Sequence, residues 1–268
     1  MSEKKLKIGL ALGGGGALGM GHVGVIEVLE ENGIHIDMIA GTSMGAIVGA
    51  AYASGVTTKE MREFADKVRT IDLMDINLQK GFLFSGVSAE KWLKACIKAT
   101  TFEELSMPFS CTACDLLNGE LVVLDSGDLI KSVRASMSVP AIFRPVDIDG
   151  RCLIDGGVVC NVPADIVKEM GADIVISVNV LGDYKLEKKP TSAMITLLDT
   201  LFLQQSMLTK NSIKKKNTDI YIDLNLGIKN QQIFGKEHSK SCINKARNAT
   251  EKMIPRLKKM IEKRMEKL

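Results

Sequence analysis

Short apolar runs alternate with amphipathic stretches in the N-terminal part of the chain. Residues 6–12 and 34–40 are short apolar runs, as expected for strands that are buried on both faces of a sheet. Between them, residues 22–31 carry apolar side chains at helical spacing, and Asn32-Gly33 ends that pattern. A run of small residues, 46–53, predicts a second helix. The order strand, helix, strand, helix indicates a right-handed parallel unit of an α/β fold.

The rest of the chain predicts further strands and helices. Strands are expected at 109–117 and 121–124, joined by an Asn118-Gly119 hairpin, and at 143–148, 152–154, 173–181 and 219–226. Helices are expected from Thr57-Thr58 to about 68, at 89–98, 128–134, 163–170 and 192–214, and from about 239 onwards. Residues 183–190 are interpreted as an exposed loop. The apolar piece 80–86 is interpreted as a buried connector beneath the helix of Trp92, with a membrane-touching loop as the alternative.

Length and composition fit one large globular domain. The chain has 268 residues, of which 46% are hydrophobic, enough to bury a substantial core. We expect a single domain over 1–268, with a motif-bearing core at 6–180 and a C-terminal strand and helices at 191–268. The net charge of +3 implies no strong field for nucleic acid, so no nucleic-acid partner is expected.

The positive charge is concentrated near the C-terminus. Nine basic residues lie between Lys245 and Lys267, against three glutamates. We interpret them as the solvated side of a helix that docks through Ile254, Leu257, Met260 and Ile261. The alternative is a surface that contacts lipid or a membrane.

The six cysteines indicate buried, reduced thiols. Cys111-x-x-Cys114 falls inside a strand-like run, where residues three apart face opposite sides, unlike a redox helix or a zinc knuckle. Reduced cysteines suit a cytoplasmic protein, and peripheral attachment to a membrane is left open. The first apolar run is broken by the glycines 13–16 and is interpreted as a core strand rather than a signal peptide. No metal-ligand cluster appears, and no cofactor is expected.

A serine lies at the sharp turn between the second strand and the helix that follows. In Gly41-Thr42-Ser43-Met44-Gly45, the glycines at i−2 and i+2 leave room for a strained strand-to-helix turn. Such a turn holds the serine hydroxyl out over the end of the sheet. The N–H groups that follow it, beginning with Met44, lie at a helix N-terminus where an oxyanion is stabilised.

Three expected strands end in residues that suit acyl transfer. Because ligands bind beyond the carboxyl ends of parallel strands, we expect these ends to share one site. Ser43 is the candidate nucleophile, and Asp155, followed by Gly156 and Gly157, is the candidate base. An aspartate has an ordinary pKa of about 3.9, so burial would have to raise it. The N–H groups of Gly14, Gly15 and Gly16 are expected to bind the oxyanion.

These motifs, in this order, resemble the patatin-like phospholipase family. The resemblance is carried by G-G-G-A-L-G at 14–19, G-T-S-M-G at 41–45 and D-G-G at 155–157, and by connecting stretches that begin at His22, Ser132 and Asn161. It covers about residues 6–180. It implies a three-layer α/β/α sandwich with a mostly parallel central sheet.

The resemblance also implies an activity, that of a serine hydrolase acting on phospholipids, lysophospholipids or simpler acyl esters. It implies a Ser43–Asp155 dyad without histidine, and structural roles for Gly19, Gly41, Gly45, Gly156 and Gly157. One departure concerns Leu18, where the family often has arginine or lysine. Leucine removes a positive charge near the site, which puts recognition of a phosphate head group in doubt.

Three alternatives remain open. A dinucleotide site at Gly14-x-Gly16-x-x-Gly19 lacks the acidic residue that should close the second strand. An α/β-hydrolase triad would use Ser43, Asp155 and His238, but His238 lies in a polar run interpreted as a solvated loop, and His22 is interpreted as a hydrogen-bonding residue at a helix start. The third alternative is a protein without catalytic activity that binds lipid on this fold.

Overall fold

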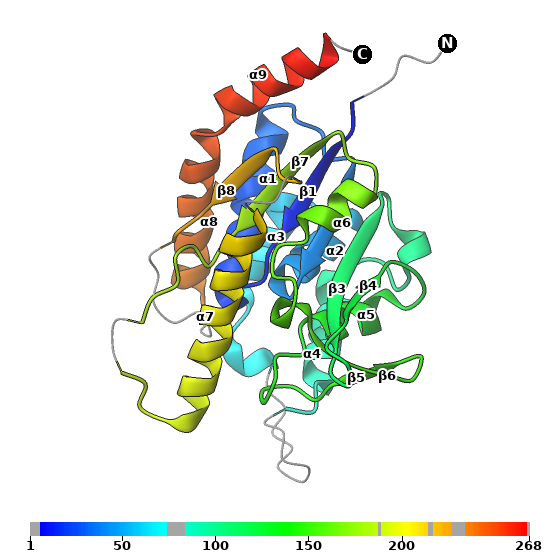
Figure 1. The fold of residues 1–268 in the computed structure, drawn as a ribbon, viewed down its shortest axis with the longest axis vertical. Coiled ribbons are helices and arrows are strands. Elements are labelled where there is room, and N and C mark those ends of the chain that lie inside the picture. Colours follow the sequence, from blue (N-terminus) through cyan, green and yellow to red (C-terminus); the bar gives the residue numbers. More distant parts are fainter. Residues whose placement is uncertain (1–5, 74–83, 187–188, 214–216, 227–233, 267–268) are drawn as a thin grey trace.

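A mostly parallel sheet forms the centre of the molecule and has helices on both faces (Figure 1). This computed structural model describes residues 6–73, 84–186, 189–213, 217–226 and 234–266. Within these ranges the sheet has eight strands in the order β5-β6-β3-β2-β1-β7-β8, with β4 also paired to β3. The strands are β1 Ile8–Leu12, β2 Met38–Thr42, β3 Phe109–Asp115, β4 Leu121–Leu124, β5 Val146–Ile148, β6 Arg151–Asp155, β7 Ile174–Asn179 and β8 Ile220–Asp223. The fold is therefore the expected three-layer α/β/α sandwich.

The helices divide between the two faces of the sheet. They are α1 Gly21–Glu31, α2 Met44–Ala53, α3 Thr58–Lys67, α4 Val87–Cys96, α5 Leu129–Ser136, α6 Ala164–Glu169, α7 Ala193–Ile213, α8 Lys236–Glu251 and α9 Ile254–Met265. Helices α1, α2, α3, α4 and α8 share the larger hydrophobic core, whereas α6 packs on the opposite face with the partly buried Ile213 of α7. None of the described helices is long and apolar enough to cross a membrane.

Strand β1 shows how side-chain size separates the two faces. Ile8, Leu10 and Leu12 enter the larger core, and the alternate positions Gly9 and Ala11 face α6. A Cβ at Gly9 would lie 2.2 Å from Val167 Cγ1 on α6. Small residues on this face therefore let the short helix α6 pack close to the sheet.

Strands β2 and β6 meet head to head along one edge of β3. Thr112 of β3 pairs with β2 and β4, and Ala113 pairs with β4 and β6. Because a strand has two edges and β4 occupies one of them, β2 and β6 must share the other. Strand β2 runs parallel to β3 and ends opposite Thr112, while β6 runs antiparallel and ends opposite Ala113. Strand β6 therefore runs opposite to β1 and β2, because the tight turn between β5 and β6 reverses the chain.

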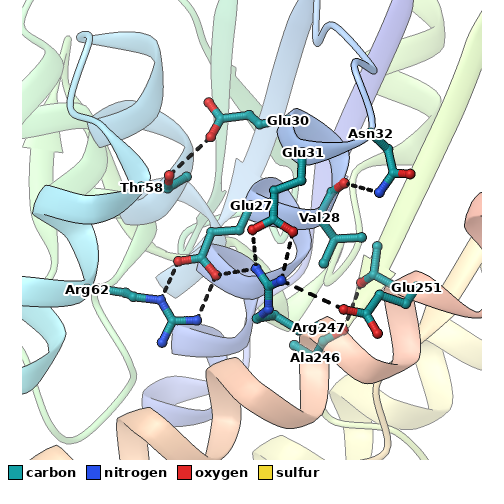
Figure 2. A network of polar contacts seen from close by, with 11 residues as sticks. Glu27, Val28, Glu30, Glu31, Asn32, Thr58, Arg62, Ala246, Arg247 and Glu251 are labelled. Atoms are coloured by element: carbon teal, nitrogen blue, oxygen red, sulfur yellow. Dashed lines mark hydrogen bonds and ion pairs between the residues drawn. The ribbon is translucent and has the colours of Figure 1, made fainter.

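The C-terminal helix α8 packs tightly against α1. Figure 2 shows Arg247 of α8 bound to Glu27 and Glu31 of α1, at 3.0 and 2.7 Å, with Arg62 of α3 also bound to Glu27. Arg247 holds the pKa of Glu31 below its ordinary value. A Cβ at Gly24 would lie 2.3 Å from the Ile243 carbonyl oxygen, so α8 packs against the α1 backbone itself.

Several predicted elements are confirmed and others need correction. Thr57 caps α3 with a capping box, and the Asn118-Gly119 turn joins β3 to β4. The strand before the serine begins at Met38 rather than at residue 34, and the C-terminal helical region is two helices, with Pro255 in the first turn of α9. His238 lies half-buried in α8, so its assignment to a solvated loop is wrong.

Part of the apolar piece 80–86 falls outside the described residues. Phe82 and Leu83 are not among them, and the interpretation of that loop stays a prediction. Phe84 is buried, and its ring lies 5.8 Å from that of Phe143.

The basic C-terminal helix α9 packs at the amino ends of the strands. Ile254 and Leu257 are buried and Met260 is partly buried, which confirms the docked side. Arg264 binds the Asp173 carbonyl and the Asp219 carboxylate, directly before β7 and β8. This edge of the sheet is opposite to the carboxyl ends of β1 and β2.

Candidate active site

Ser43 occupies a strained backbone position between β2 and α2. Its φ and ψ are 54° and −120°, which few residues other than glycine adopt, and the residue is 7% exposed. The Ser43 N–H donates to Ser136 Oγ at 2.9 Å. Strained residues persist only where their surroundings hold them, and they cluster at functional sites. The structure thus has the sharp serine turn that the sequence predicts.

The two glycines around Ser43 are required by close backbone contacts. A Cβ at Gly41 would lie 2.5 Å from the Gly45 carbonyl oxygen, and one at Gly45 would lie 2.1 Å from the Leu12 carbonyl oxygen. Helix α2 therefore starts almost in contact with the end of β1, which brings Ser43 next to the glycine loop.

We expect Gly45→Ala to lower the free energy of unfolding by about 3 kcal/mol, because an added methyl group would meet rigid backbone on β1. Chemical denaturation of the variant and the wild type measures this. The matched control is Gly235→Ala, at an extended position with nothing within 4 Å, which should change stability by less than about 1 kcal/mol. Equal stabilities for Gly45→Ala and wild type would contradict the close packing of α2 on β1.

Asp155 is the last residue of β6 and is fully buried. Its Oδ1 accepts the Gly157 N–H at 2.8 Å, and its own N–H donates to the Ser138 carbonyl at 3.0 Å. Burial raises the pKa of Asp155 to about 6, and hydrogen bonding to the Ser43 hydroxyl and the Gly157 N–H opposes this rise. Its Oδ2 is also buried, and apart from the Ser43 hydroxyl no donor among the described residues pairs with it. A raised pKa and a free oxygen lone pair are what a general base needs.

The end of α5 holds both candidate catalytic residues, a role that sequence reasoning missed. Ser136 accepts from the Ser43 backbone and the Ser138 carbonyl accepts from the Asp155 backbone. Arg134, which is 1% exposed, donates to Ser138 Oγ at 2.6 Å and lies 4.8 Å from the Phe143 ring centre. The available signal was an arginine and two serines within a small-residue stretch that resembles the family.

The glycine loop lies beside Ser43, but its three expected donors are not equivalent. A Cβ at Gly14 would lie 3.2 Å from Ser43 Cβ. The Gly14 N–H donates to the Asn161 carbonyl at 3.2 Å, so in this structure it is already engaged. No acceptor among the described residues pairs with the N–H groups of Gly15 and Gly16. Gly16 has a φ of 55°, the left-handed region that favours glycine.

Asn161 is a second residue whose place in the site the sequence did not reveal. It is buried, its Nδ2 donates to Thr209 Oγ1 on α7 at 3.1 Å, and its carbonyl fixes Gly14. Its Oδ1 has no partner within the described part of the chain and would lie 2.9 Å from a Cβ at Gly14. Asn161 therefore ties the glycine loop to α7.

His22 anchors the glycine loop from the other side. Its Nε2 lies 2.7 Å from the Gly13 carbonyl, and burial lowers the pKa of His22 to about 4. The imidazole is thus neutral at pH 7, with Nε2–H as the donor that this contact requires. The hydrogen-bonding role expected for His22 is confirmed.

Helix α7 covers the Asp155 side of the site. A Cβ at Gly157 would lie 2.4 Å from Gln205 Nε2, and Gln204 Nε2 donates to the Val158 carbonyl at 3.0 Å. A Cβ at Gly156 would lie 2.5 Å from the Thr112 carbonyl oxygen. Both glycines after Asp155 therefore permit close approach, one by α7 and the other by β3.

Gly19 of the glycine loop lies in close contact with the Met44 side chain. A Cβ at Gly19 would lie 2.3 Å from Met44 Cγ, so only glycine fits there. Leu18, which stands where the family often has a basic residue, is buried in the larger core.

His238 is not joined to the candidate pair. Its Nδ1 lies 3.7 Å from Cys242 Sγ within α8, and burial lowers the pKa of His238 below its ordinary value. Among the described residues, no hydrogen bond links His22 or His238 to Ser43 or Asp155.

Comparison with known proteins identifies the family of this chain. The family model of patatin-like phospholipases matches residues 10–168. An NTE family protein of Mycobacterium bovis is 37% identical over 182 residues, which cover 66% of this chain and 49% of that protein. Human patatin-like phospholipase domain-containing protein 6 is 34% identical over 181 residues, 65% of this chain and 13% of the human protein. The chain thus spans about half the length of the mycobacterial relative and a small part of the human one.

The fold is also that of a solved bacterial structure. VipD from Legionella pneumophila aligns with a TM-score of 0.57 and 14% identity, over 92% of this chain and 67% of that one. The family match extends from β1 through the serine turn and Asp155 into α6. The chain therefore belongs to the patatin-like phospholipase family.

Proposed function

We propose that the protein is a serine hydrolase that cleaves acyl esters of lipids through a Ser43–Asp155 dyad. The observation that carries the proposal is the head-to-head meeting of β2 and β6, which brings a strained serine and a fully buried carboxylate to one point on β3. The phospholipase name of the family supports a lipid ester as the substrate. Phospholipids, lysophospholipids and simpler acyl esters all present the bond that this dyad would cleave.

In the proposed reaction, Asp155 Oδ2 takes the proton of the Ser43 hydroxyl as Ser43 Oγ attacks the ester carbonyl carbon. The carbonyl oxygen becomes an oxyanion, which accepts hydrogen bonds from the N–H groups of Gly15, Gly16 and Met44. The protonated Asp155 then gives the proton to the departing alcohol oxygen, leaving an acyl group on Ser43. Water, deprotonated by Asp155, then attacks the acyl carbon; the bond to Ser43 Oγ breaks, the carboxylic acid leaves, and Asp155 returns the proton to Ser43 Oγ.

The pH dependence of kcat/KM tests the identity of the base. Only the ionised Asp155 accepts a proton, so kcat/KM should rise with pH, reach half its maximum near pH 6 and stay level above about pH 7. The assay is hydrolysis of a short acyl ester between pH 4.5 and 8.5. A half-maximum near pH 7 that disappears in His238→Gln would instead support the Ser-His-Asp triad.

We further propose that lipid surfaces meet the protein at α7 rather than at α9. Helix α9 packs at the amino edge of the sheet, whereas α7 contacts the residues that follow Asp155. Leu203 and Met207, four residues apart on α7, are 39% and 56% exposed. Large exposed apolar side chains next to a lipid-cleaving site suit contact with an aggregated substrate.

We expect the double variant Leu203→Gln/Met207→Gln to reduce sedimentation with phosphatidylcholine vesicles by about tenfold, since two apolar side chains are lost from the contact. Met265→Gln is the matched control, because Met265 is 62% exposed at the opposite edge of the sheet. Equal loss in both variants would contradict the placement at α7.

A further inference from the structure

A mostly apolar cavity of about 130 Å³ is lined by residues of α1, α2, α3 and α4. Its wall on α2 is formed by Met44, Ile47, Val48 and Ala51, at positions i, i+3, i+4 and i+7. This spacing places all four on one side of the helix. Met44 directly follows Ser43, so the cavity wall begins at the residue next to the proposed nucleophile.

The cavity runs along α2 away from Ser43. Seven residues separate Met44 from Ala51, which is about 10 Å along a helix axis. The far end is marked by Lys98, whose N–H donates to Ser54 Oγ and whose Nζ lies 3.3 Å from the Gly55 carbonyl, just beyond the end of α2. The lining therefore extends along α2 from Met44, the residue after the proposed nucleophile, to the C-terminal end of the helix.

Aromatic and apolar side chains form the facing wall. Phe64 of α3 and Trp92 of α4 are in edge contact, with ring centres 5.5 Å apart, and Met61 lies on the same side. The charged lining residues described are Glu60 and Lys98, which pair with each other at 2.8 Å. A phosphate head group would need an unpaired cation or several hydrogen-bond donors. The lining is instead suited to an apolar ligand.

We propose that this cavity receives the acyl chain of the substrate, with the ester carbonyl at Ser43 and the methyl end directed toward the Glu60–Lys98 pair. The inference rests on the proposed function and adds the substrate class, esters of medium-chain fatty acids. A dry apolar cavity of about 150 Å³ holds a benzene molecule, so this one accommodates roughly six carbons of the chain. Longer chains would have to leave the cavity past the ion pair.

Trp92 is the one tryptophan of the chain, so its fluorescence reports directly on the cavity. The experiment uses the full-length Ser43→Ala protein and octanoate brominated at its terminal carbon, a short-range quencher. We expect saturable quenching of Trp92 by bromooctanoate and none by bromoacetate at equal concentration. Absence of saturable quenching by bromooctanoate would overturn the proposal.

Two filling variants then test the route of the chain in the otherwise unmodified protein. Ala51→Phe should shorten the cavity and Ala95→Phe, at an exposed lining position on α4, should narrow it. Each should lower the ratio of kcat/KM for an octanoyl ester to that for an acetyl ester by at least about tenfold. The control is Val87→Phe, which adds the same bulk to α4 at a position 55% exposed and outside the lining.

The outcomes separate the cavity from the chemistry. Quenching without turnover in the wild type would support the cavity and reject the proposed hydrolase. Turnover of octanoyl esters without quenching, or with the same ratio in Ala95→Phe and Val87→Phe, would reject the cavity and leave the hydrolase standing. Ala95→Phe keeps the test decisive if the buried Ala51→Phe variant does not fold.

Discussion

Replacing Ser43 by alanine is expected to reduce ester hydrolysis by at least about 10⁴-fold, the effect of removing a nucleophile for which no neighbouring group substitutes. The fold should survive, since alanine removes one hydroxyl and leaves the Ser43 N–H bound to Ser136 Oγ. Initial rates on a short acyl ester and a phospholipid, at matched protein concentration, measure the effect.

The control for this variant is His238→Gln. His238 hydrogen-bonds within α8, so its replacement should leave the rate within about twofold of wild type. Residual activity of one tenth or more in Ser43→Ala would contradict the role of Ser43. Loss of turnover in folded His238→Gln would contradict the dyad and favour the triad.

Replacing Asp155 by asparagine is expected to have two effects of opposite sign. Turnover should fall by about 10³- to 10⁴-fold, because the general base is lost. Stability at neutral pH should rise, because the variant no longer buries a carboxylate whose pKa burial has raised to about 6. The asparagine Oδ1 can still accept the Gly157 N–H, so the turn after β6 is retained.

The direction of the stability change follows from proton linkage. Between the ordinary pKa of 3.8 and the folded value of about 6, the folded protein holds a proton that the unfolded chain has released. Wild-type stability therefore decreases as pH rises through this window, by about 3 kcal/mol for this group. Denaturation of both proteins at pH 4 and pH 7.5 should show the Asp155→Asn advantage growing by about 2 kcal/mol, most of that amount. A constant difference would contradict the raised pKa.

Ser43 and Asp155 could be named as candidates from the sequence because each lies at the end of an expected strand and is followed closely by glycine. The reason for their proximity was not identifiable. It depends on β6 running antiparallel to β3, and strand direction is set by pairing partners far apart in the chain. The Asp149-Gly150 turn indicates the hairpin of β5 and β6, but no pattern in the sequence shows that β6 pairs with β3.

Supporting contacts escaped prediction for a similar reason. Ser136, Ser138 and Asn161 act through backbone groups of residues far from them in sequence, so their spacing carries no pattern. The acceptor of the Gly14 N–H, the Asn161 carbonyl, likewise appears only in three dimensions. The sequence around His238 was interpreted as a polar loop because α8 contains few large apolar residues. The helix is stabilised mainly by packing against α1, which the local sequence does not reveal.

Covalent labelling by a fluorophosphonate probe tests the central claim most directly, because the probe reacts with an activated serine whatever the lipid substrate. Wild type, Ser43→Ala and Asp155→Asn are treated side by side at pH 7.5, and the labelled residue is located by peptide mass spectrometry. We expect labelling of wild type at Ser43, none in Ser43→Ala and strongly slowed labelling in Asp155→Asn. Failure of the wild type to react, or labelling at another residue, would contradict it.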